Sequence, residues 1–396
     1  MSTAPSRSQG SALRHARHLL ERGTVPPPGM LDATVARSWQ RSVEAGLMPF
    51  GRPNEAHLMA DGLARAVERR HHLLTRARPV LEYLHAQTRG SGSMVLLADD
   101  RGFVLDALGD ADFIDRADRV ALRPGASWHE HHRGTNAIGT ALAEGAAVTV
   151  HGGEHFLERN TFLTCSAAPL AGPDGVLLGA LDISGHCRSR SAHTASLVLV
   201  AAHMIENRLF EAFHGTAAAR LRVHPQATGI GTVAEGLVAL DGGGRIVGIN
   251  RAGAALLRIA PEDLGRTGIE DVLDLRLADL LGHALTPPGG VAPVRRRDGK
   301  TLFLRLDGET ARPVAVGGGP RRSATRAAPP PAPAAAPARR WRSRGRRRQW
   351  RRRGGGGLMA GPFIAAAAAR PPPCPASPAP CSTFCCRRAA CPAGRW

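Results

Sequence analysis

Histidine and acidic side chains that could bind a metal ion gather near the middle of this 396-residue chain. His129, Glu130, His131 and His132 follow one another directly. Imidazole and carboxylate groups suit zinc, iron or nickel. Consecutive residues point to opposite faces of a strand and fan out by about 100° each on a helix, so one ion could not easily take all four side chains. We therefore favour other roles for these residues.

A second metal-like pattern follows twenty residues later. His151, Glu154 and His155 match H-x-x-E-H, the inverted zinc-protease motif. That motif needs a helix to bring its two histidines together. Gly152 and Gly153 follow an expected strand and instead favour a tight turn. We expect Glu154 and His155 to cap this turn or to line a pocket.

Side chains suited to a small-molecule pocket lie beside the first histidine cluster. Trp128 can supply an apolar wall, and Arg133 can supply hydrogen bonds to a carboxylate or carbonyl oxygen. Thr135 and Asn136 offer further directional hydrogen bonds. The alternative is that Trp128 belongs to the core while Thr135 and Asn136 only cap a helix.

Cys165 lies within an apolar run and is interpreted first as a small buried hydrophobe. A reactive cysteine would need a lowered thiol pKa and solvent access. No Ser-His-Asp arrangement or pair of carboxylates stands out, so we expect no enzymatic activity and no bound metal or cofactor. The candidate ligand-binding residues are Trp128, Arg133, Thr135, Asn136, His155 and Cys165.

Helices are predicted before these residues, over 11–22, 32–46 and 55–88. In the second of them Val35, Trp39 and Val43 recur at helical spacing. In the third, Pro79 is expected to kink the helix or to split it in two.

Strands and further helices are predicted around the candidate site itself. Strands are expected at 93–99, 102–107, 147–150, 163–170 and 176–183, with helices at 135–144 and 191–213. Thr135 can cap the start of the shorter helix, and Gly145 suits the left-handed position at its end. Helices followed by antiparallel strands and a closing helix indicate an α+β fold.

A second α+β unit of about 80 residues follows a predicted linker at 225–231. Its expected elements are strands at 236–240, 245–250, 291–296 and 301–306, with a helix at 251–258. From residue 311 onward, runs of Pro, Ala, Gly and Arg replace this pattern. Low complexity of this kind is typical of disorder.

The charge is unevenly distributed. The formal net charge is +19, but 18 of the 52 basic residues and none of the 33 acidic residues lie in 311–396. The rest is therefore close to neutral. Of the cysteines, only Cys165 and Cys187 lie outside the tail, which is typical of a reducing cytoplasm. Neither a signal peptide nor a run of about 20 apolar residues occurs, so a cytoplasmic, non-membrane protein is expected.

The block from Arg123 to Gly185 resembles a known sensory domain. The phrases RPGASW, GTNAIGTAL, VHGGEHF, LTCSAAPL and GALDISG are similar to the GAF domain of acetoin-catabolism-type regulators, within the sigma-54-dependent Fis-family transcriptional activators. SWQRS at 38–42 resembles the N-terminal region of that family, and EGLVALDGGGRIVGIN at 235–250 resembles the opening of a PAS domain.

This resemblance implies four regions. They are an N-terminal helical region at 1–90, a GAF sensory domain at 91–213, a PAS-like domain at 228–310 and a low-complexity tail at 311–396. It further implies a small-molecule signal and a homodimer, with sigma-54 RNA polymerase and DNA as contacts of intact family members only.

The ATPase and the helix-turn-helix that follow in this family are not apparent here. A phosphate-binding loop needs G-x-x-x-x-G-K-[ST]. The only lysine, Lys300, follows Gly299 but has Val294 at the position of the first glycine. We expect neither ATP hydrolysis nor sequence-specific DNA binding from this chain. The tail is interpreted as a frameshifted or inert end, in preference to a nucleic-acid-binding segment built on RRRQWRRR.

Two alternatives remain open at this point. One is a stand-alone ligand-binding module that regulates partners by dimerising. The other, less favoured, is a metalloenzyme that uses the histidines between 129 and 155.

Overall fold

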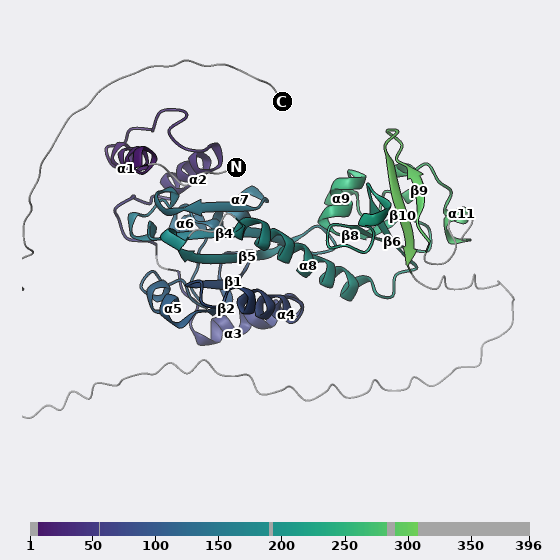
Figure 1. The fold of residues 1–396 in the computed structure, drawn as a ribbon, viewed down its shortest axis with the longest axis horizontal. Helices are drawn as coiled ribbons and strands as arrows, with labels where there is room; N and C mark the ends of the chain where they lie inside the picture. Colours follow the sequence, from purple (N-terminus) through teal and green to yellow (C-terminus); the bar gives the residue numbers. More distant parts are fainter. Residues whose placement is uncertain (1–6, 55, 190–192, 283–289, 308–396) are drawn as a thin grey trace, which may run out of the picture. The chain divides into compact units, whose positions relative to one another are not determined.

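The computed structural model describes residues 7–54, 56–189, 193–282 and 290–307. The predicted tail at 311–396 lies outside the described residues. Two five-stranded antiparallel sheets, each with its own helices, form the architecture (Figure 1). This confirms the α+β prediction.

The first sheet holds the candidate site. Its strands are β1 (Ser93–Asp99), β2 (Val104–Gly109), β3 (Val148–His151), β4 (Leu163–Ala171) and β5 (Leu177–His186), in the order β2-β1-β5-β4-β3. In the register of the three central strands, Asp182 lies between Leu96 and Ala167, and Ser184 is opposite Cys165. The strands predicted from the apolar runs are therefore confirmed.

Both faces of this sheet are covered, which explains why β1 is buried along its whole length. Helices α4 (His71–Thr88) and α8 (Thr194–His214) pack on one face, in a core that includes Val95, Leu97 and Ile183. The other face packs against α5 (Ala111–Asp118), α7 (Ala137–Glu144) and Trp128. Successive residues of a strand point to opposite faces, so Cys165 and the residues two positions before and after it in β4 lie on the α7 side of the sheet.

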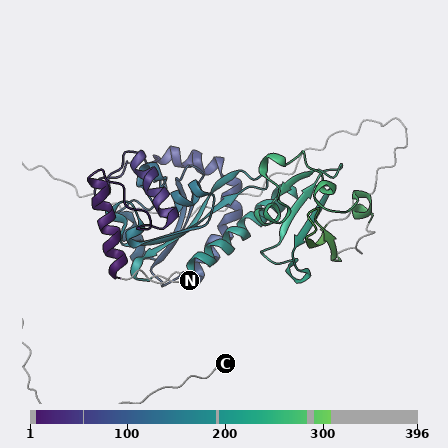
Figure 2. The ribbon, with the colours of Figure 1, turned by 90° about the horizontal axis from the view of Figure 1, so that it is seen from above.

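The first two helices, α1 (Arg7–Glu21) and α2 (Ala33–Glu44), join the same body (Figure 2). Asp32 caps α2 by accepting a hydrogen bond from the Thr34 amide. Ala16, Val35 and Trp39 form a small apolar core with Phe156 and Leu157. The N-terminal helices are thus packed onto the loop that leads into β4.

The predicted effect of Pro79 is wrong in position. The chain divides into α3 (Ala60–Arg69) and α4, and the break falls at Arg70, whereas Pro79 lies inside α4. Arg70 leaves helical geometry (φ −106°, ψ 19°), and its guanidinium pairs with Asp100 at 2.5 Å in the turn after β1. The break therefore serves a contact between α3–α4 and the first hairpin.

The second sheet has the order β8-β7-β6-β10-β9. Its strands are β6 (Ala219–His224), β7 (Gly236–Leu240), β8 (Ile246–Ile249), β9 (Ala292–Arg295) and β10 (Thr301–Asp307), with helices α9 (Arg251–Leu257), α10 (Ile269–Val272) and α11 (Leu277–Leu281). Four of these strands were predicted. The central strand β6 was missed, although its sequence alternates: Leu221 and Val223 lie on the buried face, and the arginines between them lie on the other face.

Among the described residues, no helix combines the length and the apolar composition that crossing a bilayer requires.

Candidate functional site

The segment between β2 and α7 is held in shape by hydrogen bonds to its own backbone. The Trp128 indole is buried and donates to the Ala121 carbonyl at 3.0 Å. The Arg133 guanidinium is also buried, donates to the Val120 carbonyl at 3.1 Å and lies 5.7 Å from the Trp128 ring. The indole N–H of Trp128 and the guanidinium of Arg133 therefore hold this segment in a fixed conformation around the Trp128 ring.

The start of α7 differs from the prediction. Asn136, not Thr135, is the N-cap, and its side-chain oxygen accepts a hydrogen bond from the Gly139 amide at 2.9 Å. Its side-chain nitrogen donates to the Trp128 and Gly134 carbonyls, so one amide joins the helix to the preceding segment. At the other end Gly145 is left-handed (φ +63°), which confirms the predicted ending.

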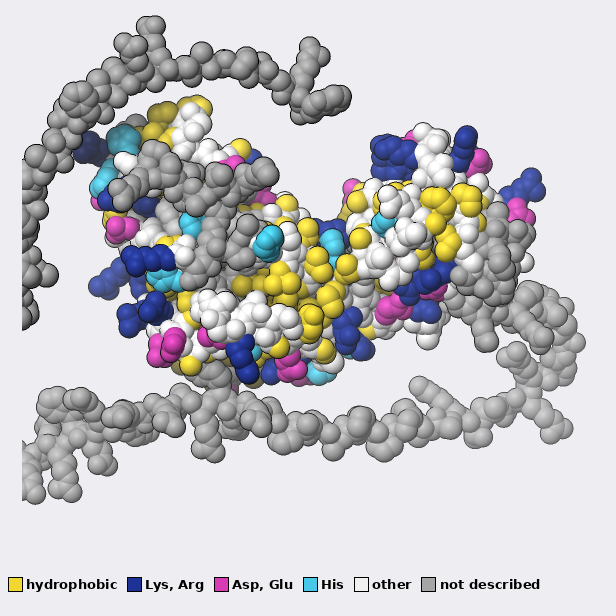
Figure 3. All heavy atoms as spheres, in the orientation of Figure 1, with side chains coloured by type: hydrophobic (Ala, Val, Ile, Leu, Met, Phe, Trp, Pro, Cys, Tyr) yellow, Lys and Arg dark blue, Asp and Glu magenta, His cyan; other side chains and the backbone are white. Residues whose placement is uncertain are grey.

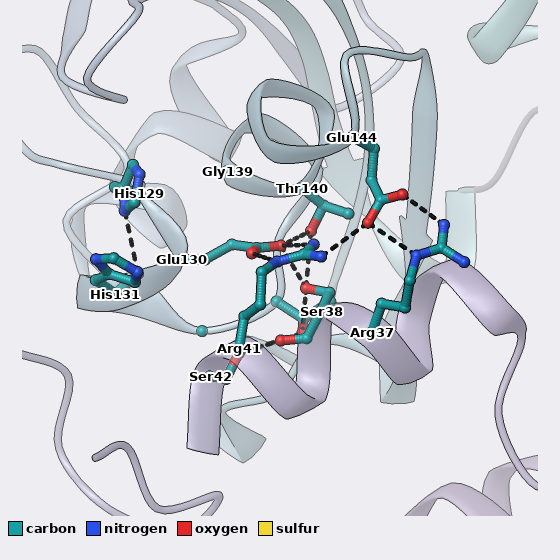
Figure 4. A network of polar contacts seen from close by, with 12 residues as sticks. Arg37, Ser38, Arg41, Ser42, His129, Glu130, His131, Gly139, Thr140 and Glu144 are labelled. Carbon is teal, nitrogen blue, oxygen red and sulfur yellow. Dashed lines mark hydrogen bonds and ion pairs between the residues drawn. The ribbon is translucent and has the colours of Figure 1, made fainter. Parts of the chain in front are cut away.

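A buried carboxylate connects α2 to this region. Glu130, in α6 (Glu130–Arg133), accepts hydrogen bonds from Ser38 at 2.5 Å and from Thr140 at 2.7 Å (Figure 4). Arg41 of α2 binds both of its oxygens, at 2.5 and 3.0 Å. A bidentate guanidinium–carboxylate pair is among the strongest polar contacts in proteins, and it is geometrically specific.

A second, more exposed carboxylate extends this network. Glu144, in the last turn of α7, pairs with Arg41 at 2.9 Å and with Arg37 at 2.5 Å (Figure 4). The hydrogen bond to Glu130 is the main cause that raises the pKa of Arg41. Hydrogen bonds from Arg37 and Arg41 lower the pKa of Glu144. Two arginines of α2 are thus matched to two carboxylates of α6 and α7.

The first histidine cluster does not converge on one point. The His129 ring accepts a hydrogen bond from the His131 amide at 3.2 Å, and the His132 ring contacts the Ser127 hydroxyl at 2.8 Å. Burial lowers the pKa of His129 and of His132. Within the described ranges, no group of three His, Cys, Asp or Glu side chains is arranged to hold a metal ion.

The second histidine pair flanks a turn, as the two glycines predicted. Gly152–Glu154 form one turn of 3₁₀ helix, and the Glu154 carboxylate caps it by accepting the His151 amide at 2.7 Å. His155 is fully buried, with its ring 3.1 Å from the Gly152 carbonyl and 3.5 Å from the Cys165 sulfur. Burial lowers the pKa of His155 to about 3, so the ring is neutral near pH 7.

The outer side of this turn is held by α1 and α2. Arg17 donates to the backbone carbonyls of Gly153, His155 and Phe156. The Trp39 indole donates to a fourth carbonyl, that of Glu154, at 2.8 Å. Arg17 and Trp39 therefore hold the segment 152–157 by hydrogen bonds to its backbone carbonyls, while the His155 side chain points to the core.

An acidic side chain that the sequence reasoning missed lies in that core. Asp182 of β5 is fully buried, and the Ser184 hydroxyl donates to its Oδ2 at 2.5 Å. Its other oxygen, Oδ1, is buried without a hydrogen-bond partner. Burial raises the pKa of Asp182 to about 7. A lone carboxylate inside the apolar run 176–183 was the available signal, since such residues are rarely buried without a reason.

Of the six candidate residues, the structure brings His155 and Cys165 into contact. Burial raises the pKa of the Cys165 thiol well above its usual range, so the thiol is neutral. Thr135 is buried, and its hydroxyl oxygen lies 2.7 Å from that of Ser38. The polar groups of Trp128, Arg133 and Asn136 have the backbone partners given above. Ligand contact by any of the six stays a prediction.

Comparison with known proteins identifies a family of regulators. Residues 9–207 match the family model described as the MimR N-terminal domain. The acetoin catabolism regulatory protein of Cupriavidus necator is 34% identical over 303 residues, which cover 71% of this chain and 45% of that protein. The propane 2-monooxygenase operon transcriptional activator MimR of Mycolicibacterium smegmatis is 32% identical over 202 residues, covering 50% and 33%.

The chain spans less than half the length of these curated relatives. Among solved structures, the E. coli DhaR(N)–DhaL complex contains a chain that is 18% identical, with a TM-score of 0.42, covering 69% of this chain and 99% of that one.

Replacing Glu130 with Gln is expected to lower the free energy of unfolding by about 3 kcal/mol, because Arg41 then lacks its buried counter-charge. Glu144→Gln is the matched control and is expected to cost about 1 kcal/mol or less, since its partner Arg37 is exposed and its partner Arg41 keeps the buried Glu130. Urea unfolding measures both. Equal losses in the two variants would contradict the special role of Glu130.

The raised pKa of Asp182 is expected to make the stability of the fold depend on pH. Its pKa rises from about 3.9 in the unfolded chain to about 7 in the folded one, so the folded state holds the proton more tightly. The stabilisation is complete below pH 4 and is lost as the pH rises through 7. Between pH 5 and 8, the free energy of unfolding should fall by about 3 kcal/mol relative to Asp182→Asn. Urea unfolding at each pH measures this free energy. If it changes with pH in the same way for the wild type and for Asp182→Asn, the prediction is refuted.

Proposed function

Because this chain belongs to the MimR N-terminal domain family of acetoin-regulator-like transcriptional activators, we propose that it is the signal-sensing region of a sigma-54-dependent activator. In this proposal the first domain, of GAF type, binds a small molecule in the cytoplasm. The second, of PAS type, follows it, and binding controls transcription through the intact regulator. Control of this kind requires the ligand to bind two states of the region with different affinity.

The observation that carries the proposal is the polar cluster inside the first domain. His155, Cys165, Asp182 and Ser184 are all buried, among apolar side chains that include Trp128. A stable core alone does not need such groups, because buried polar atoms cost free energy unless they are paired. A binding site in a sensory domain gives them a use.

We propose no ATP hydrolysis and no sequence-specific DNA binding for this chain. Lys300, its only lysine, lies in the turn between β9 and β10. Phosphate-binding loops of the GKS/T type instead connect a strand to the start of a helix. The sheet-edge turn supports a structural role for Gly299 and Lys300.

A thermal-shift screen of small metabolites tests the ligand proposal. At least one compound should raise the unfolding temperature, since a ligand at a hundred times its dissociation constant stabilises by about 2.7 kcal/mol. Trp128→Ala and Arg133→Ala should reduce that shift if these residues line the site, whereas Arg69→Ala, on the exposed end of α3, should leave it unchanged. A broad library without a single hit, checked by calorimetry, would reject the proposal.

We further propose that the region forms a homodimer through α8. Leu199, Val200, Met204 and Phe213 of this helix are 36–54% exposed, and Tyr83 of α4 is 56% exposed. On the face shown in Figure 3, hydrophobic side chains gather over α8. Apolar side chains that cluster on a surface commonly mark a protein interface.

Sedimentation of the purified chain tests the dimer. Val200→Lys should weaken dimerisation by at least about tenfold, because it places a charge in the apolar contact. Val176→Lys, at a valine of the β4–β5 turn that is 55% exposed against 43% for Val200, is the control and should leave the dimer intact. A monomeric wild-type protein, or a Val200→Lys variant that dimerises normally, would refute an interface on α8.

A further inference from the structure

A hollow of about 680 Å³, the α8 hollow, lies along the C-terminal half of α8. Its lining combines α8 with Arg76 of α4, with Arg222 of β6 and with the segment 231–237, which enters β7. Helices α4 and α8 cover the face of the first sheet opposite to α7 and Trp128, so the hollow is separate from the site discussed above. Pockets for small molecules have volumes of about 300–1,000 Å³, so this space suits a small ligand.

The walls of the α8 hollow are held in place by contacts with α8. Helix α4 packs along α8 in the core on that face of the first sheet. Phe210 of α8 packs against Leu237 of β7. Asn207, one turn earlier, donates a hydrogen bond to the Val233 carbonyl at 3.3 Å and so positions the segment before β7. One helix therefore supports every side of the hollow.

The carboxylates around the α8 hollow are matched by arginines. Arg222 pairs with Glu211 at 3.0 Å and also with Glu235 and Asp307. Two further arginines pair with these carboxylates: Arg220, which lies 2.7 Å from Glu211, and Arg305, which lies 3.0 Å from Asp307. Three positive charges thus balance three negative ones, and none of these carboxylates is left to neutralise another cation.

Two more arginines line the α8 hollow without such a balance. Arg76 and Arg208 are exposed, and neither forms an ion pair with a carboxylate in the part of the chain that the structure describes. The Arg208 Nε donates to the Arg76 backbone carbonyl at 3.1 Å, which keeps its guanidinium beside α4. The hollow therefore carries a surplus of two positive charges. A concave surface with charge of one sign concentrates ligands of the opposite sign.

We propose that the α8 hollow binds a small organic dianion, a dicarboxylate or a phosphate monoester, through Arg76 and Arg208. A guanidinium donates paired hydrogen bonds whose geometry matches carboxylate and phosphate oxygens. Met204 and Val233 belong to the same lining and supply apolar contacts for the carbon atoms of the ligand. This second site does not depend on the sensory function proposed for the first domain.

Isothermal titration of the purified chain with matched probes tests the ligand class. The dianions are glutarate and butyl phosphate, and their uncharged counterparts are glutaramide and butan-1-ol. We expect at least one dianion to bind at least about tenfold more tightly than its counterpart, and added salt to weaken binding, because charges at an open site are screened. The tighter of the two dianions identifies the anionic group. No binding of either dianion, equal binding of the uncharged probes, or inorganic phosphate bound as tightly as the organic dianions, would overturn the inference.

Two variants locate the site. Arg76→Gln and Arg208→Gln should each weaken dianion binding by about tenfold, which corresponds to the loss of one charge-assisted hydrogen bond. The matched control is Arg65→Gln, at an exposed arginine of α3 outside the lining, and it should bind as the wild type does. Unchanged binding in both of the hollow's variants would overturn the assigned site. Unfolding temperatures establish that each variant is folded.

A third variant is expected to bind more tightly than the wild type. Glu211→Gln removes one negative charge and leaves Arg220 and Arg222 in place, so the positive surplus of the α8 hollow rises. The dianion should then bind about threefold more tightly or better at low salt, since each added positive charge attracts it. A purely structural role of these residues does not produce such a gain. Weaker binding by a folded Glu211→Gln variant would contradict the proposal.

Sedimentation and the thermal-shift screen separate this inference from the other proposals. Met204 also belongs to the α8 surface proposed for the dimer. If Arg76→Gln and Arg208→Gln weaken self-association while no anion binds, the arginines contact a second copy of the chain and the inference fails. A thermal shift that persists in Trp128→Ala but is lost in Arg208→Gln supports the α8 hollow, whatever the outcome for the first-domain site.

Discussion

The contact between Glu130 and Arg41 determines how the N-terminal helices are attached to the first domain. Glu130 is buried, so it depends on the cation and hydroxyls that reach it, and most of these come from α2. Removing a charge from water is costly, and only a well-formed pair repays that cost. The position of α2 therefore follows from the needs of one carboxylate, and α1 follows α2 through the shared core around Trp39.

Polar groups in this domain fall into two kinds. In the segment around Trp128, side chains such as Arg133 and Asn136 donate to nearby backbone carbonyls and give an irregular stretch a fixed form. In the core, Asp182 and Asn160 keep atoms without partners. The first kind explains how the irregular segment between α5 and α7 keeps a fixed form, and the second marks the places in the core where burial is not balanced by a hydrogen bond.

Local features of this protein were predictable from its sequence, whereas partnerships across long sequence separations were not. Apolar runs located the strands of the first sheet, and Gly152 and Gly153 predicted the turn that rules out a helical zinc motif. Glu130 was considered only with its histidine neighbours, because nothing local indicates that Arg41, 89 residues earlier, is its partner. Asp182 was concealed in a strand-like run, since a single polar residue does not disturb an apolar pattern.

Arg17 binds the segment 152–157 only through carbonyl oxygens, and Trp39 donates a hydrogen bond to one further carbonyl. Every residue type has a backbone carbonyl, so these hydrogen bonds do not depend on which side chains the segment carries. The His155 side chain, which points inward, takes no part in the attachment to α1. Backbone and side chain therefore have separate roles in this segment: its carbonyls hold the N-terminal helices, while the His155 side chain belongs to the core.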